Sequence, residues 1–318
     1  MIKKYWFSLG LLVVFAVVLA DGSGAAAVAG RWLGRHHGPD GVIMGIFFLS
    51  GLMIDVRLLR AGLVDVTGTL AALGVIFAAA PLAAAGLCLL PLATDLKIGL
   101  LLVAVMPSTL TSGVVMTGHA GGNMAHALMI TVIANMLAVF TIPLVLPQLL
   151  HLTAATAGIT TDKTAMIAKI ALLVLLPLSV GMACKTHRRV YAISRQYQPG
   201  LQAATLACVL LIVFMAVSGA RSMVLENLGR SGQVMLLTTV FHLILLGCAA
   251  CLCRLLSIGP RRREAVIFMG AQKTLPLSVV LQMTFFSGYG IALVVCVVHH
   301  LVHLLMDGVL SSRLGGSR

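Results

Sequence analysis

Charge is scarce in this chain, and negative charge is the scarcest. Of its 318 residues only 9 are Asp or Glu, charged residues make up 10% and aromatic residues 5%. Soluble domains carry roughly 25% charged residues. With 60% hydrophobic residues and a mean hydropathy of +1.07, the composition excludes an ordinary soluble enzyme and predicts an integral membrane protein.

The motifs of common enzyme classes are also missing. The sequence has no Ser/His/Asp arrangement, no phosphate-binding loop and no dinucleotide fingerprint. A membrane-embedded enzyme should show paired carboxylates or a nucleophile beside a base, and neither is visible. Cys248, Cys251 and Cys253 lack the second ligand pair of a metal or redox site, so we interpret them as packing residues. We therefore expect a protein that is not an enzyme.

Basic residues outnumber acidic ones and give a net charge of +13. In a soluble protein this charge would suggest nucleic acid, but here the basic residues lie between apolar runs, as in cytoplasmic loops. With the N-terminus inside, fourteen of the 22 Lys and Arg fall on inner segments, seven on outer segments, and Lys273 within a span. The bias is strongest in the predicted loops 185–195 and 254–263. We expect both termini in the cytoplasm and no nucleic-acid partner.

Apolar runs of membrane-spanning length recur along the whole chain, since a spanning helix needs about 20 residues. Ten are predicted, at Tyr5–Ala20, Gly41–Ile54, Val64–Leu92, Ile98–Thr117, Asn123–Leu149, Ala165–Cys184, Leu201–Gly219, Val234–Leu256, Ala265–Phe286 and Gly290–Leu310. The alanines at 25–27 leave a cleaved signal peptide open for the first run, although an odd number of spans would then remain.

Two short motifs recur at almost the same displacement. Ser50-Gly51 in the second run matches Ser218-Gly219 in the seventh, 168 residues later, and Pro107 in the fourth matches Pro276 in the ninth, 169 residues later. Because five spans are an odd number, two such halves enter the membrane from opposite sides, which is the inverted-repeat plan of secondary transporters. The predicted fold is an all-α membrane protein with halves 1–155 and 156–318.

Runs four and nine are interrupted at matching places. Pro107 and Gly113 in run four, and Gly270 and Pro276 in run nine, break regular hydrogen bonding amid hydroxyl, amide and amine side chains. Freed backbone groups at membrane depth must line a buried or wet cavity, so a transport site is predicted there. The candidate substrate- or ion-binding residues are Pro107, Ser108, Thr109, Ser112, Gly113, Asn123, Thr131, Asn135, Gln272, Lys273, Thr274 and Pro276. Hydrogen bonding between helices or helix capping is the alternative role for the neutral members.

Three segments carry a family resemblance: 47–53 (FFLSGLM), Pro107-Ser-Thr with 114–123 (VVMTGHAGGN), and 270–276 (GAQKTLP). They resemble the bile acid:sodium symporter superfamily, and most of all its bacterial SBF-like branch. The resemblance implies ten helices, a panel of spans 1, 2, 6 and 7, and a core of spans 3–5 and 8–10. It also implies that the broken helices cross in the core and that substrate binds between core and panel. The resemblance to a bacterial branch implies the inner membrane of a bacterium.

The sequence departs from the superfamily at the sodium ligands. That pattern has a Ser-Asn pair in the fourth helix, hydroxyls in the fifth, and a Glu four residues before a Gln in the ninth. The matching positions here are Ser112-Gly113, Ala127 and Thr131, and Phe268 before Gln272. Ser112, Thr131 and Gln272 remain as candidate sodium ligands, without the formal negative charge that a hard cation favours.

Lys273 stands beside the retained Gln272 and lies deep in its span, where charges are usually functional. We hypothesise that its ammonium replaces a sodium ion or faces an anionic substrate. Sodium and protons both stay open as the coupling ion, and we predict no other cofactor. The histidines at 299, 300 and 303 have helical metal-ligand spacing, but too few partners follow for zinc, so packing or a proton-sensitive site is expected.

The functional prediction is a secondary active transporter, working by alternating access, for an organic anion or amphipathic solute. A non-transporting membrane regulator, or a sodium-coupled bile-acid-type symporter with a reduced ion site, is the alternative. The expected partners are a small anionic solute and the lipid bilayer, whereas the substrate and the oligomeric state are not readable from the sequence.

Overall fold

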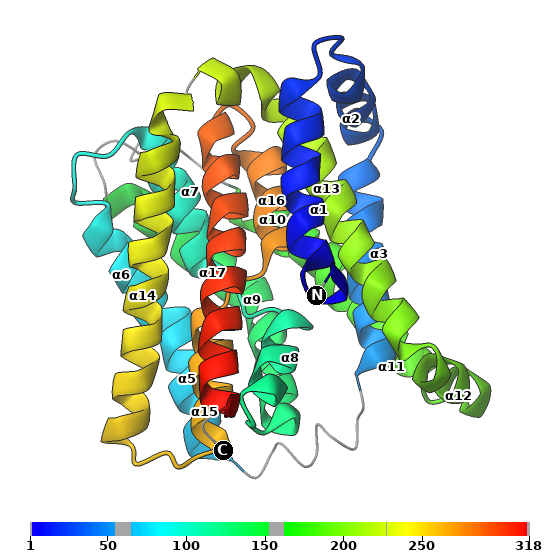
Figure 1. Ribbon diagram of the computed structural model, residues 1–318, viewed down its shortest axis with the longest axis vertical. Coiled ribbons are helices and arrows are strands. Elements are labelled where there is room, and N and C mark those ends of the chain that lie inside the picture. Colours follow the sequence, from blue (N-terminus) through cyan, green and yellow to red (C-terminus); the bar gives the residue numbers. More distant parts are fainter. Residues whose placement is uncertain (1, 55–64, 153–161, 227, 317–318) are drawn as a thin grey trace.

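The helices of the protein follow the apolar runs of its sequence. The computed structural model describes residues 2–54, 65–152, 162–226 and 228–316, in which every regular element is a helix (Figure 1). Their bounds are α1 (Ile2–Ala20), α2 (Ala25–Arg35), α3 (Gly38–Met53), α5 (Val66–Gly74), η1 (Val75–Ala79), α6 (Ala80–Leu87), α7 (Thr94–Val105), α8 (Ser112–His119), α9 (Met124–Leu152), α10 (Lys163–Ile170), η2 (Ala171–Leu175), α11 (Leu176–Cys184), α12 (Arg188–Gln196), α13 (Gln198–Glu226), η3 (Leu228–Arg230), α14 (Ser231–Leu255), α15 (Arg262–Ala271), α16 (Leu275–Phe285) and α17 (Gly290–Gly316).

Within the described residues, seven helices are long and apolar enough to cross a bilayer, or eight if α1 and α2, which meet at 110°, form one bent span. α3 is a shorter apolar helix. Large apolar side chains such as Leu12, Leu82, Phe140 and Leu236 are exposed on these helices, and contact with lipid accounts for them. The all-helical, multi-pass membrane class is therefore confirmed. The boundary predicted between residues 155 and 156 lies outside the described residues.

Two helices were not predicted. α12 occupies most of the segment expected to be a loop at 185–195, and α2 follows the first span. Both helices carry arginines beside apolar side chains, for example Arg189 and Ile193 in α12. A search for long apolar runs does not detect such amphipathic helices, because their polar face lowers the mean hydropathy.

The helices pack as two groups around the cavity described below. α3 packs against α11 and α13, and α13 also packs against α1 and α2. In the other group, α17 packs against α7 and α14, while α15 lies against α14, α5, α8 and α9. Figure 1 shows α17 between α14 on one side and α1 on the other. The run Arg262–Phe285 is the most enclosed, with 94% of its apolar window buried, so the second broken segment is shielded from lipid.

Glycines allow α3 and α11 to touch through their backbones. A Cβ at Gly51 would overlap the Leu178 carbonyl oxygen, and one at Gly181 would overlap the Phe48 carbonyl oxygen. Small residues permit this approach between membrane helices, where close packing replaces the hydrophobic effect as the source of association. The second and sixth predicted spans thus form one rigid pair.

Two cationic side chains donate hydrogen bonds to carbonyl oxygens at the C-terminal ends of α3 and α1. Lys185 Nζ donates to the carbonyl oxygens of Met53 (3.3 Å) and Ile54 (2.9 Å) at the end of α3. Arg221 donates to the carbonyl oxygens of Val18 and Asp21, each at 2.9 Å, after α1. Positive charge at a helix C-terminus pairs the last carbonyls and complements the helix dipole. These residues therefore have a structural role.

An ion pair anchors the start of α15 to the start of α5. Asp65 caps α5 by accepting a hydrogen bond from Gly68 N–H (2.9 Å), and the Arg262 guanidinium donates to both of its carboxylate oxygens. Burial raises the pKa of Asp65, but the hydrogen bonds from Arg262 and Gly68 outweigh this effect and hold the pKa below its ordinary value. The pair thus positions the entry to the second broken segment at neutral pH.

The glycine contact predicts a position-specific loss of stability. Gly51→Ala should lower the thermal unfolding temperature by several degrees, because overpacking costs about 1–3 kcal/mol and here the obstacle is backbone. Gly45→Ala on the same helix is the matched control, since a Cβ there meets nothing within 4 Å. Thermal unfolding of purified protein in detergent checks this, and equal unfolding temperatures for the two variants would contradict the contact.

Candidate functional site

Both interrupted segments break in the same way. Met106, the residue after α7, is extended with φ −70° and ψ 145°, and Gln272, the residue after α15, is extended with φ −72° and ψ 144°. The residue before a proline disfavours the helical region, which explains Met106 because Pro107 follows. Pro276 lies in the first turn of α16, where its missing N–H costs nothing. The two breaks are joined directly, since Thr274 N–H donates to the Pro107 carbonyl oxygen at 2.9 Å.

Lys273 lies beside the point where the two broken segments meet, at Pro107 and Thr274, which we call the crossing. Its ammonium donates to the carbonyl oxygens of Ile76 (2.9 Å), Ala104 (3.0 Å) and Met106 (3.0 Å), and the side chain is 1% exposed. An ammonium has three donors and a neutral amine only two, so three carbonyl acceptors match the charged form. The end of α7 adds the negative pole of a helix dipole.

Two of these carbonyls, those of Ile76 and Ala104, lack a backbone donor for a reason visible in the sequence. In η1 the Ala80 N–H bonds to the Val75 carbonyl five residues earlier, and the next bond of that pattern would join residue 81 to Ile76. Pro81 has no N–H, so the Ile76 carbonyl is free for Lys273. Ala104 lies in the last turn of α7, where carbonyls have no partner within the helix. Lys273 thus supplies the donors that two breaks in regular structure remove.

Gln272 links the hydroxyls of the first break to a buried carboxylate. Its Oε1 accepts from Thr109 Oγ1 (2.8 Å) and Ser112 Oγ (3.1 Å), and its Nε2 donates to Asp307 Oδ2 (2.8 Å) and lies 3.1 Å from Met116 Sδ. The orientation of the amide is therefore determined at both ends. Oε1 accepts from Thr109, whereas the single hydroxyl proton of Ser112 is shared between Oε1 and Thr109 Oγ1, which lies 2.9 Å from Ser112 Oγ.

Two polar side chains of α9 hold the first break from the opposite face. Thr131 Oγ1 donates toward the carbonyl oxygens of Ser108 (3.2 Å) and Thr109 (3.0 Å), and Asn135 Nδ2 donates to Ser108 (3.2 Å) and Thr131 (2.8 Å). Two buried oxygens nearby, Ser108 Oγ and Asn135 Oδ1, have no hydrogen-bond partner. These two neutral oxygens are fewer than a hard cation normally requires.

The remaining candidate residues have other surroundings. A Cβ at Gly113 would lie 2.7 Å from Met269 Sδ and 3.0 Å from Gln272 Oε1, so other side chains fill the room of the asparagine that the resemblance implied. Asn123 Oδ1 accepts from the backbone N–H of Ala125 (3.0 Å) and His126 (3.2 Å) and caps α9. The structure therefore does not bring Asn123 into the crossing.

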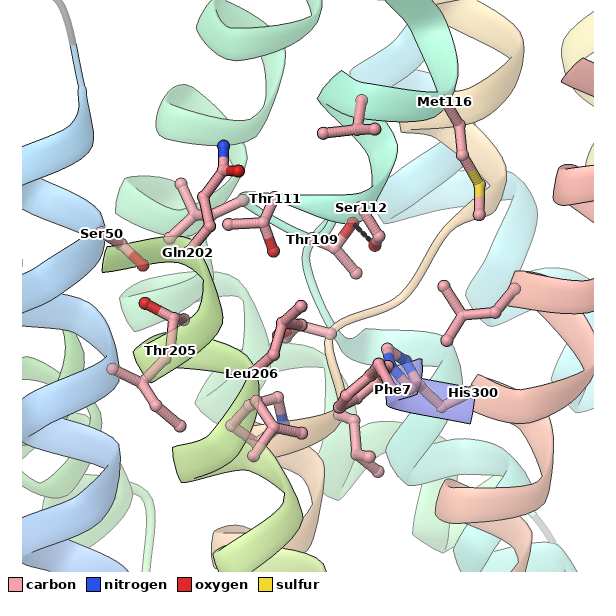
Figure 2. Close-up of a pocket in the computed structure, with 18 of the residues that line it drawn as sticks. Phe7, Ser50, Thr109, Thr111, Ser112, Met116, Gln202, Thr205, Leu206 and His300 are labelled. Carbon is pink, nitrogen blue, oxygen red and sulfur yellow. Dashed lines mark hydrogen bonds between the residues drawn. The ribbon is translucent and has the colours of Figure 1, made fainter. Parts of the chain in front are cut away.

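A cavity of about 400 Å³ lies beside the crossing (Figure 2). Four predicted residues line it, Thr109, Ser112, Thr274 and Pro276, and Lys273 does not. The facing wall comes from α3 and α13, with residues that the prediction omitted: Ser50, Gln202, Thr205 and Leu206. Gln202 and Thr205 interrupt an apolar run, and polar residues at membrane depth are the signal that could have identified them.

The character of the cavity is apolar with scattered hydroxyls. Phe7, Phe47, Leu110 and Leu304 contribute apolar surface, while the hydroxyls come from both walls. None of the described lining residues is Lys, Arg, Asp or Glu. The first turns of α8 and α16 also border the cavity through Ser112 and Pro276, and helix N-termini favour negative charge. The cavity can therefore accept an amphipathic molecule that ends in a compact anionic group.

Comparison with known proteins finds a matching family model and several similar sequences. A model of the SBF-like CPA transporter family matches residues 5–315. Over 282 residues, or 84% of this chain, it is 27% identical to a "probable sodium/metabolite cotransporter BASS4, chloroplastic" of Oryza sativa. It is 30% identical over 232 residues, 68% of this chain, to the protein of the same name in Arabidopsis thaliana. An "uncharacterized protein" of Pseudomonas aeruginosa is 26% identical over 98% of this chain and 93% of its own length. The matches span 66% of the rice protein and 52% of the Arabidopsis protein.

The carbonyl contacts of Lys273 predict that it is required for stability. Lys273→Met should lower the free energy of unfolding by about 2–4 kcal/mol, because a buried carbonyl left without a donor costs about 1–3 kcal/mol. Lys169→Met is the control, since Lys169 pairs with Asp40 at 3.0 Å in a position that is one-quarter exposed, and such pairs contribute about 1 kcal/mol or less. Thermal unfolding distinguishes them, and a Lys273 variant no less stable than the control would refute the three contacts.

Proposed function

This chain belongs to the SBF-like CPA transporter family, as its motifs predicted, and within that family we propose that it is a secondary carrier of an amphipathic organic anion. The observation that carries the proposal is the cavity at the crossing of the two broken segments. It lies where helix N-termini, hydroxyls and apolar side chains meet at membrane depth, which is how transporter substrate sites are built.

We propose alternating access between a panel and a core as the mechanism. In this proposal α1, α3, α10–α11 and α13 form the panel, and the remaining spans form the core, in ten spans arranged as two inverted halves. The matching displacement of Pro107 and Pro276 supports the repeat. The cavity lies on the boundary, so movement of the core against the panel would expose it to one side at a time.

The anionic class of the solute follows from what surrounds the cavity. None of the described lining residues is Lys, Arg, Asp or Glu, and the histidines among them are His119 and His300. A cationic solute would meet two helix N-termini with no carboxylate to balance its charge, whereas an anion is favoured there. The apolar walls suit a hydrocarbon or ring portion, and a volume of about 400 Å³ suits a small metabolite.

We propose that the Lys273 ammonium replaces a coupling cation. Half-helix C-terminal carbonyls coordinate sodium in transporters with broken helices, and here such carbonyls, those of Ala104 and Met106, bind Lys273 instead. The rice relative is named a sodium/metabolite cotransporter, so sodium coupling is the rival proposal for this chain. The oxygens left for it are Ser108 Oγ and Asn135 Oδ1.

The proposed location is the inner membrane of a bacterium with both termini in the cytoplasm. The excess of Lys and Arg on inner segments supports this orientation, and the match to a Pseudomonas protein along almost its whole length supports the bacterial setting.

The carrier proposal predicts saturable solute exchange in liposomes. Counterflow should be detectable for at least one member of a panel of organic anions, and Thr205→Trp should reduce it more than tenfold because the indole fills the cavity from α13. Leu211→Trp on the same helix is the control, since Leu211 is 39% exposed on the outer surface. Absence of saturable exchange for the whole panel would instead favour a non-transporting regulator.

The coupling proposal predicts that uptake persists without sodium. Wild-type uptake should change less than twofold when external sodium is replaced by choline, because a fixed ammonium already occupies the carbonyl cage. The measurement is repeated at two external pH values, and with Lys273→Met normalised to the amount of folded protein. Uptake that strictly requires sodium, and that Lys273→Met leaves unchanged, would overturn this proposal.

A further inference from the structure

Four histidines gather in the interior between α14 and α17. His242 comes from α14, and His299, His300 and His303 come from α17. All four are at most 6% exposed. The ring centres of His242 lie 5.8 Å from those of both His299 and His303, and His300 lies 4.5 Å from His303. The α17 spacing was apparent in the sequence, but the fourth histidine joins them only in the fold.

Most of the ring nitrogens in this histidine cluster are unpaired. The buried nitrogens without a hydrogen-bond partner are His242 Nδ1, His299 Nε2, His300 Nδ1, and both Nδ1 and Nε2 of His303. Buried polar atoms are normally hydrogen-bonded, so five unpaired nitrogens in one place need an occupant. A metal ion is not the answer, because no group of three His, Cys, Asp or Glu among the described residues has the geometry to hold one.

Asp307 supplies the negative charge of the cluster. It is fully buried, its Oδ1 lies 2.9 Å from His242 Nε2, and its Oδ2 accepts from Gln272 at 2.8 Å. Because the carboxylate accepts from Nε2–H, the free acceptor of a neutral His242 is Nδ1. That nitrogen faces no partner and is available to a proton, whose charge the carboxylate would balance.

The other charged groups on the neighbouring helices lie at helix ends or are already paired. Lys273, between α15 and α16, binds its three carbonyls. The remaining charged residues or histidines on packed elements are Asp65 before α5, Asp95 and Lys97 in the first turn of α7, Arg262, Arg263 and Glu264 in the first turn of α15, Arg221 and Glu226 toward the end of α13, Arg230 in η3, Arg254 at the end of α14, Arg313 at the end of α17, and His119 at the end of α8. The cysteines on these elements are Cys208 in α13, Cys248, Cys251 and Cys253 in α14, and Cys296 in α17. Asp307 is therefore the counter-charge closest to the histidines.

We propose that the histidine cluster is a buried proton-binding site, with His242 as the group that takes the proton and Asp307 as its fixed counter-anion. Without the proton, the charges of Lys273 and Asp307 cancel in the interior. The proton adds one positive charge, which an anionic solute in the cavity balances. The protein interior that holds both the proton and the solute then has no net charge, and net charge in a low-dielectric interior is costly. This charge balance rests on the proposed function.

The side-chain amide of Gln272 connects the histidine cluster to the cavity. Gln272 bonds to Asp307 at one end and to Thr109 and Ser112, which line the cavity, at the other. A change in the charge of the His242–Asp307 pair therefore alters the acceptor that orients Gln272, and with it the hydroxyls that face the solute.

Nitrogen NMR of the histidine rings tests the site directly. Protein labelled with ¹⁵N-histidine is placed in lipid nanodiscs without any solute, and spectra are recorded while the pH is lowered from about 8 to about 5, the range in which imidazoles titrate. His242→Gln assigns the signals of His242, and His151→Gln, at an exposed position at the end of α9, controls for the loss of one histidine.

In the wild type, the His242 signals should change from the neutral to the cationic form on acidification. In Asp307→Asn they should stay neutral, because the counter-anion is lost. The asparagine keeps the size of the side chain but can accept from only one of His242 and Gln272. Wild-type signals that stay neutral to about pH 5, or cationic signals that appear equally in Asp307→Asn, would overturn the proposal. If Asp307→Asn does not fold, the wild type and His242→Gln still decide whether the proton binds. Since no solute is present, this outcome is independent of the counterflow result.

Discussion

An unpaired backbone carbonyl is intolerable in hydrocarbon, and the interior of this protein is arranged around that constraint. Breaking two helices at membrane depth frees carbonyls that water cannot reach. The Lys273 ammonium collects three of them, from Ile76, Ala104 and Met106, and so ties the third and fourth predicted spans to the ninth. The cavity lies beside these two breaks and is closed on the other side by α3 and α13.

The same constraint organises the polar side chains around the crossing. Thr131 and Asn135 hold the outer face of the first break, and Gln272 holds its hydroxyls. With these groups bound to one another, the cavity is left with hydroxyls and apolar surface and no formal charge from Lys, Arg, Asp or Glu among its described lining residues. A site of this kind selects solutes through shape and through the dipoles of two helix N-termini.

The carboxylate near the crossing comes from an unexpected helix. The resemblance implied a glutamate four residues before Gln272, where this chain has Phe268. Asp307, on α17, instead contacts the Gln272 amide, with His242 on its other side. Negative charge is thus placed next to the Gln272 amide from the tenth predicted span.

Much of the architecture could be read from the sequence because lipid imposes a simple rule. Apolar runs must be helical, so the membrane class and the positions of the spans follow from hydropathy, and prolines at 107 and 276 mark the breaks because they cannot continue a helix. Family membership also followed from local motifs. The amphipathic helices α2 and α12 escaped because their signal is periodic rather than apolar.

Only the tertiary structure decided which buried polar groups contact one another. The sequence pointed to Lys273 as functional but left open whether it faces a solute or a carbonyl cage, since that depends on Pro81 freeing a carbonyl almost two hundred residues earlier. It showed three histidines in one helix but not the fourth, because His242 reaches them only through the packing of α14 on α17. The sequence determines which polar groups lie in membrane-spanning segments. Three-dimensional packing determines their hydrogen-bond partners, because each buried polar atom must pair with a donor or acceptor that the fold brings within reach.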